Sequence, residues 1–264
     1  MDTVRSFTQI QIPEVAGDEF IERSISLHAS SKDCHGDFLI LSGSMVLYLA
    51  GRFEYFVRER FEAACDDIAG KCVKFSNMPK LMQENLIKLT AEVMQSPRKF
   101  GHGDKGVEAF VRNLAANMCA SNGFENVNSS CLSITMDNMR SDVVKDLFKR
   151  IGLDDIWKLV GEQAAVKAHY SIAQSDAASA KTREYLNDVM ELRNAIAHPS
   201  ANVQWPNVSK VSDIIEFFEV IAPVLCDVIS VHESVQIDHK SALAAEISPA
   251  QSPVVQAVSN SEIH

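Results

Sequence analysis

The chain has 264 residues, 46% of them hydrophobic and 23% charged, and a formal net charge of −10. This length suffices for a sizeable core, and no apolar run is long enough to cross a membrane, since even MVLYLAGRFEYFV carries Arg52 and Glu54. Six cysteines scattered without a CxxC pair disfavour a disulfide scaffold and a zinc module, so we expect reduced thiols, no metal and no cofactor. The start carries neither a secretion signal nor a transit peptide, which indicates a cytoplasmic protein.

The negative charge is concentrated at the two ends of the chain. Residues 1–37 hold 3 basic and 7 acidic side chains, and residues 212–264 hold 1 and 8. The part between them is nearly neutral, with 21 basic and 20 acidic side chains. This distribution does not indicate a dedicated nucleic-acid groove, so any contact with nucleic acid should be local or shared between subunits.

Helical spacing of apolar residues dominates the sequence, and the one clean alternation is FTQIQIP near the start. A short helix is expected at 16–29, followed by a long one at 37–68 that ends at Gly70. The long helix is apolar on most of its circumference, as is typical of the central helix of a bundle.

Further helices are expected between the polar, glycine-rich or proline-rich loops. They span 80–95, 107–120, 137–153, 154–170, 176–198 and 209–234. Gly152 should end the third of these helices and Asp154 should cap the start of the fourth, while CLSITM at 131–136 has a strand-like pattern.

The pattern predicts an all-α, up-and-down helical bundle. We divide the chain into an N-terminal extension with a short helix at 1–34, a helical domain at 35–235 and a C-terminal tail at 236–264. The tail is small, polar and interrupted by prolines, so we expect it to be disordered.

The stretch ELRNAIAHP at 191–199 carries the candidate functional residues. At 100° per residue, Arg193 falls in the middle of the apolar stripe of its helix, while Asn194 and His198 lie one turn apart on its polar edge. A buried guanidinium is costly unless it is paired or lines a cleft or an interface. Pro199 disfavours helical dihedrals at His198, so the imidazole should lie at the helix end, where the macrodipole favours its protonated form.

These three residue types are the parts of a metal-independent RNA-cleaving site. A guanidinium offers donors to phosphate oxygens as negative charge develops, and a histidine transfers protons. RNA is the natural substrate because its 2′-hydroxyl can attack the adjacent phosphate, whereas DNA lacks that nucleophile. On spacing alone, a polar helix end with an ion-paired Arg193 remains an alternative.

LRNAIAHP resembles the signature of the HEPN superfamily (higher eukaryotes and prokaryotes nucleotide-binding), in which Arg is commonly followed by Asn and then, a few residues on, by His. The sequence is most similar to prokaryotic ribonuclease-like members of the RiboL-PSP-HEPN type. LSGSMVLYLAGRFEYFVRERFE resembles their first conserved helix, and VVKDLFKRIGLDDIW resembles a short element before their motif helix. The similarity extends over about residues 35–235.

The resemblance implies a homodimer in which the motif helices face each other and build a composite cleft from two Arg and two His. Active members are metal-independent endoribonucleases, often toxins or anti-phage effectors held in check by an antitoxin or regulatory protein. Arg193 would then bind the scissile phosphate, His198 would act as general acid or base, and Asn194 would orient either one. Two other readings stay open, a catalytically inactive HEPN interaction or sensor module and a monomeric structural adaptor.

Glu54 on the long helix is a supporting candidate, because these families often bring an acidic or polar residue from this helix to the motif. We expect it either to balance the charge of Arg193 or to form a surface pair with Arg58 at i, i+4. His169 and Tyr170 at the end of another helix are weaker candidates for the same cleft.

For the remaining conspicuous residues we expect structural roles. Trp157 and Trp205 are expected to pack in the protein interior and not to stack on bases. GHGDKG at 101–106 is expected to be a turn, because it lacks the spacing and the preceding strand of a phosphate loop. Cys34 and His35 are read as a loop pair without further metal ligands.

Overall fold

A computed structural model of the chain describes residues 35–120, 123, 126–198 and 204–247. These residues form nine α-helices and two short 3-10 turns and contain no strand, so the predicted all-α fold is confirmed. FTQIQIP and the helix expected at 16–29 lie outside the described residues. The α-helices are α3 (His35–Gly70), α4 (Lys80–Gln95), α5 (Asp104–Cys119), α6 (Ser129–Leu132), α7 (Ser141–Lys149), α8 (Ile156–Glu162), α9 (Ala164–Tyr170), α10 (Ser175–Ala197) and α11 (Val208–Ile247).

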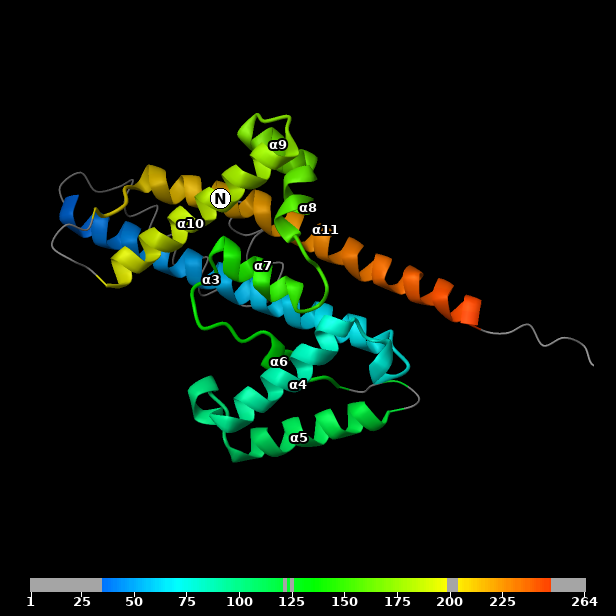
Figure 1. Ribbon diagram of the computed structural model, residues 1–264. Coiled ribbons are helices and arrows are strands. Elements are labelled where there is room, and N and C mark those ends of the chain that lie inside the picture. The colour runs from blue at the N-terminus through cyan, green and yellow to red at the C-terminus, as the bar shows by residue number, and fades with distance from the viewer. Residues whose placement is uncertain (1–34, 121–122, 124–125, 199–203, 248–264) are drawn as a thin grey trace, which may run out of the picture.

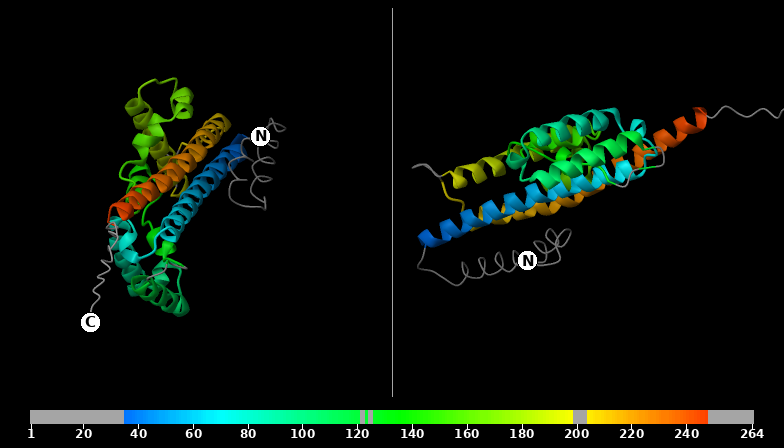
Figure 2. Two further views of the ribbon diagram at one scale, coloured as in Figure 1. Left: turned by 90° about the vertical axis from the view of Figure 1, so that its right-hand side faces the viewer. Right: turned by 90° about the horizontal axis from the view of Figure 1, so that it is seen from below.

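Three long helices, α3, α10 and α11, form the centre of the bundle. Figures 1 and 2 show α3 and α11 side by side and running in the same direction, with α10 running the opposite way. The direction therefore alternates along the chain from α3 to α10 to α11, as in an up-and-down bundle. The hairpin of α4 and α5 follows the C-terminal end of α3, and α6 contacts both α3 and α4, while α8 and α9 pack against α10 and α11.

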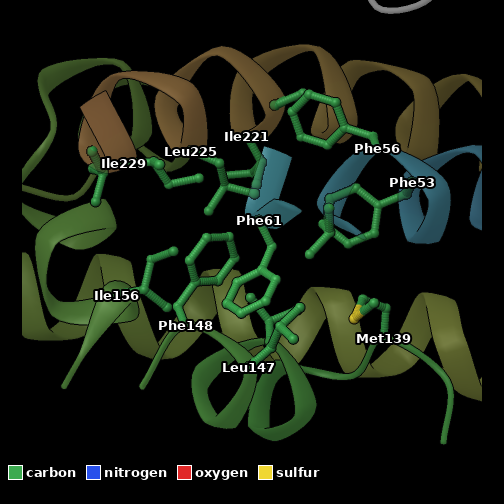
Figure 3. Packing of buried hydrophobic residues seen from close by; sticks show 14 of the residues in the cluster. Phe53, Phe56, Phe61, Met139, Leu147, Phe148, Ile156, Ile221, Leu225 and Ile229 are labelled. Atoms are coloured by element: carbon green, nitrogen blue, oxygen red, sulfur yellow. The ribbon is translucent and has the colours of Figure 1, made fainter. Parts of the chain in front are cut away.

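Aromatic side chains from distant parts of the sequence join these helices. Phe53 of α3 stacks on Phe218 of α11 with ring centroids 4.7 Å apart, and Phe61 meets Phe148 of α7 edge-on at 5.5 Å. Figure 3 shows Phe53 and Phe61 in one apolar cluster with Met139, which belongs to the segment before α7. Such offset and edge-to-face pairs add to the stabilisation from apolar burial.

The helix at 80–95 is found as predicted, and α3 exceeds its predicted range by two residues at each end. Gly152 has a φ of 88°, which fits its predicted role as helix terminator. At the C-terminus the backbone stays helical to Ile247, so residues 236–247, expected within the tail, are part of α11. Residues 248–264 lie outside the described part of the chain.

Three local predictions are wrong. CLSITM is not a strand, because its first two residues end α6. Both residues are buried, which a helical turn inside the core allows for neighbours in the sequence. The helix expected at 154–170 is broken at Gln163, whose side chain donates to the carbonyl of Leu159 at 3.1 Å and so caps α8. The cap at the start of α8 is Asp155 and not Asp154, since Asp155 accepts from the backbone N–H of Lys158.

The helix expected at 137–153 begins only at Ser141. Residues 136–140 are non-helical and are held by hydrogen bonds to other elements, as described below. Among the described helices, none is both long and apolar enough to span a membrane.

Candidate functional site

The three motif residues lie at the C-terminal end of α10 and line one open hollow of about 620 Å³. Glu191 and Ala195 of the same helix complete this wall. The opposite wall consists of Met136, Asp137, Asn138 and Arg140. We call residues 136–140 the facing segment. The structure thus brings Arg193, Asn194 and His198 together. The volume of the hollow lies in the range of small-ligand sites.

The apolar stripe of α10 explains the position of Arg193. Residues of the predicted stripe are buried, among them Leu186, Val189, Met190 and Ile196. Arg193 shares their side of the helix but is only half-buried, because the helix end extends past the core to the hollow. Its guanidinium therefore has access to water and avoids the desolvation cost of a dry core.

Asn194 connects the two walls of the hollow. The Nη1 atom of Arg193 donates to Oδ1 of Asn194 at 3.1 Å, and Nδ2 of Asn138 donates to the same oxygen. Within the described residues Nδ2 of Asn194 donates no hydrogen bond. Two donors on one oxygen fix the orientation of the amide and leave its N–H groups available to donate to a ligand.

His198 is the residue that ends α10. Its backbone N–H bonds to the carbonyl of Asn194 at 3.0 Å, and its φ of −127° and ψ of 67° are no longer helical. The side chain is exposed and lines the hollow. The imidazole thus lies at the helix end, as the sequence predicts, and is open to the hollow.

Glu54 supports the facing segment. Its Oε1 atom accepts a hydrogen bond from the backbone N–H of Met139 at 3.3 Å. The described residues show no ion pair between Glu54 and either Arg193 or Arg58, and Arg58 donates instead to Oγ1 of Thr135 at 2.9 Å. Both sequence readings of Glu54 are thereby replaced by a structural role, that of an acceptor for a backbone N–H.

Three further contacts hold the facing segment and the start of α7. The side chain of Met139 is fully buried and lies in the aromatic cluster of Figure 3. The backbone N–H of Ser141 donates to Oδ1 of Asn187 on α10 at 2.9 Å, and its carbonyl accepts from Nε1 of Trp157 at 2.5 Å. The facing segment is therefore tied to α3 and α10, and the start of α7 is tied to α8 and α10.

The other residues singled out in the sequence lie elsewhere. Nδ1 of His169 is 3.7 Å from Glu216, and its ring meets Tyr170 edge-on, so neither residue lines the hollow. Trp157 is fully buried, as predicted, and Trp205 packs over Gly43. Cys34 and the side chain of His35 lie outside the described residues.

The GHGDKG stretch leads from a 3-10 turn at Pro97–Phe100 into α5. Gly101 has a φ of 77°, a left-handed conformation that suits glycine. His102 packs edge-on against Phe110 at 4.8 Å between ring centroids. Residues 101–103 form the predicted turn, whereas residues 104–106 already belong to the first turn of α5.

Sequence reasoning missed the whole facing segment, because it assigned these residues to the first turn of a helix. The available signal was the polar run DNMR, in which Asp and Asn favour turns more than helix interiors. No group of three or more His, Cys, Asp or Glu side chains within the described ranges is placed to hold a metal ion.

The comparison with protein families places the chain in a known family. The sequence profile of the RiboL-PSP-HEPN family matches residues 18–230, which is most of the chain, and the chain belongs to this family. HEPN domains are often ribonucleases, and the family indicates a ribonuclease-type or nucleotide-related function. No significant match was found among curated proteins or solved structures.

Proposed function

We propose that the chain is a metal-independent endoribonuclease that cleaves single-stranded RNA by attack of a 2′-hydroxyl on the adjacent phosphate. The observation that carries this proposal is the shared hollow of Arg193, Asn194 and His198, in which the guanidinium and the amide are hydrogen-bonded to each other. Single strands are favoured because the attacking oxygen, the phosphorus and the leaving oxygen must come into line, which a stacked duplex opposes.

In this reaction the 2′-oxygen bonds to phosphorus while the bond from phosphorus to the 5′-oxygen breaks. A base takes the proton from the 2′-hydroxyl and an acid gives one to the 5′-oxygen, which leaves a 2′,3′-cyclic phosphate and a 5′-hydroxyl. Arg193 neutralises the charge that develops on the non-bridging oxygens, and a free N–H of Asn194 donates to one of them. His198 acts as the acid or the base.

The need for an acid and a base on opposite sides of the phosphorus favours a homodimer. His198 is the histidine that the described part of the chain places in the hollow, and one imidazole cannot serve both sides at once. A second copy with its motif helix facing the first would supply the other imidazole and a second guanidinium. In line with the family resemblance, we further propose that the protein is a cytoplasmic toxin or anti-phage effector restrained by an antitoxin or regulatory protein.

The test is to incubate the purified chain with mixed RNA in EDTA and to identify the new ends. We expect 2′,3′-cyclic phosphate ends. The rate at which they form should fall by about 10²-fold or more in His198→Ala and comparably in Arg193→Ala. His169→Ala and Arg112→Ala, which change the same residue types outside the hollow, should keep full activity. Intact RNA with the unaltered protein would contradict the proposal and favour an inactive interaction or sensor module, and sedimentation would test the dimer.

A further inference from the structure

The facing segment contributes a cation that the motif does not include. Arg140 lines the same hollow as Arg193 and His198, and its side chain is exposed. Within the described residues Arg140 forms no ion pair, and its side chain makes no hydrogen bond. Its guanidinium, which always carries a charge, therefore keeps its donors for a ligand.

The backbone around Arg140 is fixed although its side chain is free. Its own N–H bonds to the carbonyl of Asn138 at 2.6 Å, and its carbonyl accepts from Val144 at 3.0 Å. The residues on either side are held by Glu54 and Asn187. A guanidinium on a fixed base loses less entropy when it binds than one on a mobile loop, so this placement favours binding.

Two arginines on opposite walls of the hollow favour a ligand with more than one anionic group. Arg140 comes from the facing segment and Arg193 from α10, so two guanidinium groups approach from opposite walls. The lining also contains the carboxylates of Asp137 and Glu191, and none of the described ion pairs joins them to either arginine. A strand of RNA presents a phosphate at every nucleotide, and a guanidinium binds phosphate through a fork of two donors.

We propose that Arg140 is a second phosphate-binding residue, which holds a phosphate next to the scissile one. This inference rests on the proposed function, because it takes single-stranded RNA as the ligand. Arg193 would act on the phosphate that reacts, whereas Arg140 would act on its neighbour and fix the register of the strand. Arg140 thus contributes to binding more than to the chemical step.

The test uses the full chain and a uniformly 2′-O-methylated single-stranded RNA, which has no free 2′-hydroxyl and stays intact. Binding is followed by fluorescence anisotropy over a range of salt concentrations for the unaltered protein, Arg140→Ala and the control Arg112→Ala. Arg112 is an exposed arginine of α5 paired with Glu108, so the control makes the same change in net charge outside the hollow. Thermal melting of each variant checks that it is folded.

We expect Arg140→Ala to bind about fivefold more weakly and to lower the magnitude of the logarithmic salt slope by about 0.7, the value for one phosphate contact on a single strand. Arg112→Ala should match the unaltered protein. The inference is overturned if Arg140→Ala binds normally, if both variants lose affinity equally, or if the unaltered protein does not bind the oligonucleotide. Cleavage of the unmethylated RNA is measured separately. Binding without cleavage would refute the proposed function, and the binding data alone would then decide whether Arg140 contacts a phosphate.

Discussion

Asn138 and Asn194 are 56 residues apart in sequence, yet Nδ2 of Asn138 donates to Oδ1 of Asn194 across the hollow. The same oxygen accepts from Arg193, so Asn138 fixes the amide that lies beside the candidate phosphate-binding group. Because Asn138 acts through Asn194, we regard it as a positioning residue.

Asn138→Ala should lower the rate of RNA cleavage about tenfold, because the amide of Asn194 can then rotate and Arg193 loses a fixed neighbour. KM should change less than kcat, since Arg193 and His198 are still present. Asn138→Asp should be at least as slow, because a carboxylate cannot donate to Oδ1 and would compete for Arg193. Steady-state kinetics test this, with Asn85→Ala on α4 as the matched control, and full activity of Asn138→Ala would refute the positioning role.

The structural role of Glu54 can be tested against the counter-charge role expected from the sequence. As an acceptor for the N–H of Met139 it needs only an oxygen, whereas as a counter-charge for Arg193 it needs its negative charge. Glu54→Gln should therefore keep stability within about 1 kcal/mol, and Glu54→Ala should lose about 2 kcal/mol by leaving the N–H without its partner. Chemical denaturation measures both values. Equal losses in the two variants would support the counter-charge instead.

The motif helix could be predicted from sequence to within one residue at each end, 176–198 against Ser175–Ala197. Its apolar residues keep helical spacing over six turns, and its polar end is encoded by neighbours in the sequence. The placement of Arg193 in the stripe also followed from angles alone, whereas a cleft beside it was one of several explanations for that placement. These features are local, so the sequence is sufficient for them.

The position of the facing segment opposite α10 could not be predicted, because it depends on partners far along the chain. Glu54 lies 85 residues from Met139, Asn194 lies 56 from Asn138, and Asn187 lies 46 from Ser141. The strand prediction for CLSITM was wrong for the same reason. The guanidinium of Arg150 donates to the carbonyls of Leu132 and Ile134, which strand pairing would otherwise use. Tertiary hydrogen bonds override local preference in both places.

Gly161 marks a close approach of α8 to the start of α10, and this predicts a large effect on stability. A Cβ at Gly161 would lie 2.7 Å from Cβ of Ser179 and still closer to the carbonyl oxygen of Ser175. Gly161→Ala should therefore lower the free energy of unfolding by about 2 kcal/mol, the cost of forcing packed elements apart.

The matched change is Gly51→Ala on the exposed side of α3, where a Cβ would meet nothing within 4 Å. It should raise the free energy of unfolding by about 0.5–1 kcal/mol, because alanine loses less backbone entropy in a helix than glycine. Denaturant titrations of the two variants measure the difference. Similar effects from both substitutions would show that the contact between α8 and α10 can relax.

Glu233 of α11 predicts a pH-dependent stability. Its side chain is buried, and its Oε1 atom has no hydrogen-bond partner within the described residues. Burial raises the pKa of this carboxyl above 4.5 and nearby Asp67 raises it further, while Lys71 and Arg60 oppose the shift. The native state thus binds the proton more tightly than the unfolded chain does. The resulting stabilisation is present below pH 4.5 and is lost as the pH rises through the native pKa.

At neutral pH the ionised carboxylate therefore has a cost, and Glu233→Gln should remove it. We expect the variant to be more stable by about 1 kcal/mol at pH 7, or about 2–4 °C in Tm. The gain should shrink as the pH falls through the raised native pKa toward 4.5, because the native carboxyl then takes up its proton. Thermal melts over this range test the prediction, with Glu184→Gln at an exposed site of α10 as control. A loss of stability at pH 7 would instead mean that Lys71 and Arg60 outweigh burial, so that the charge of Glu233 holds α11 to α3.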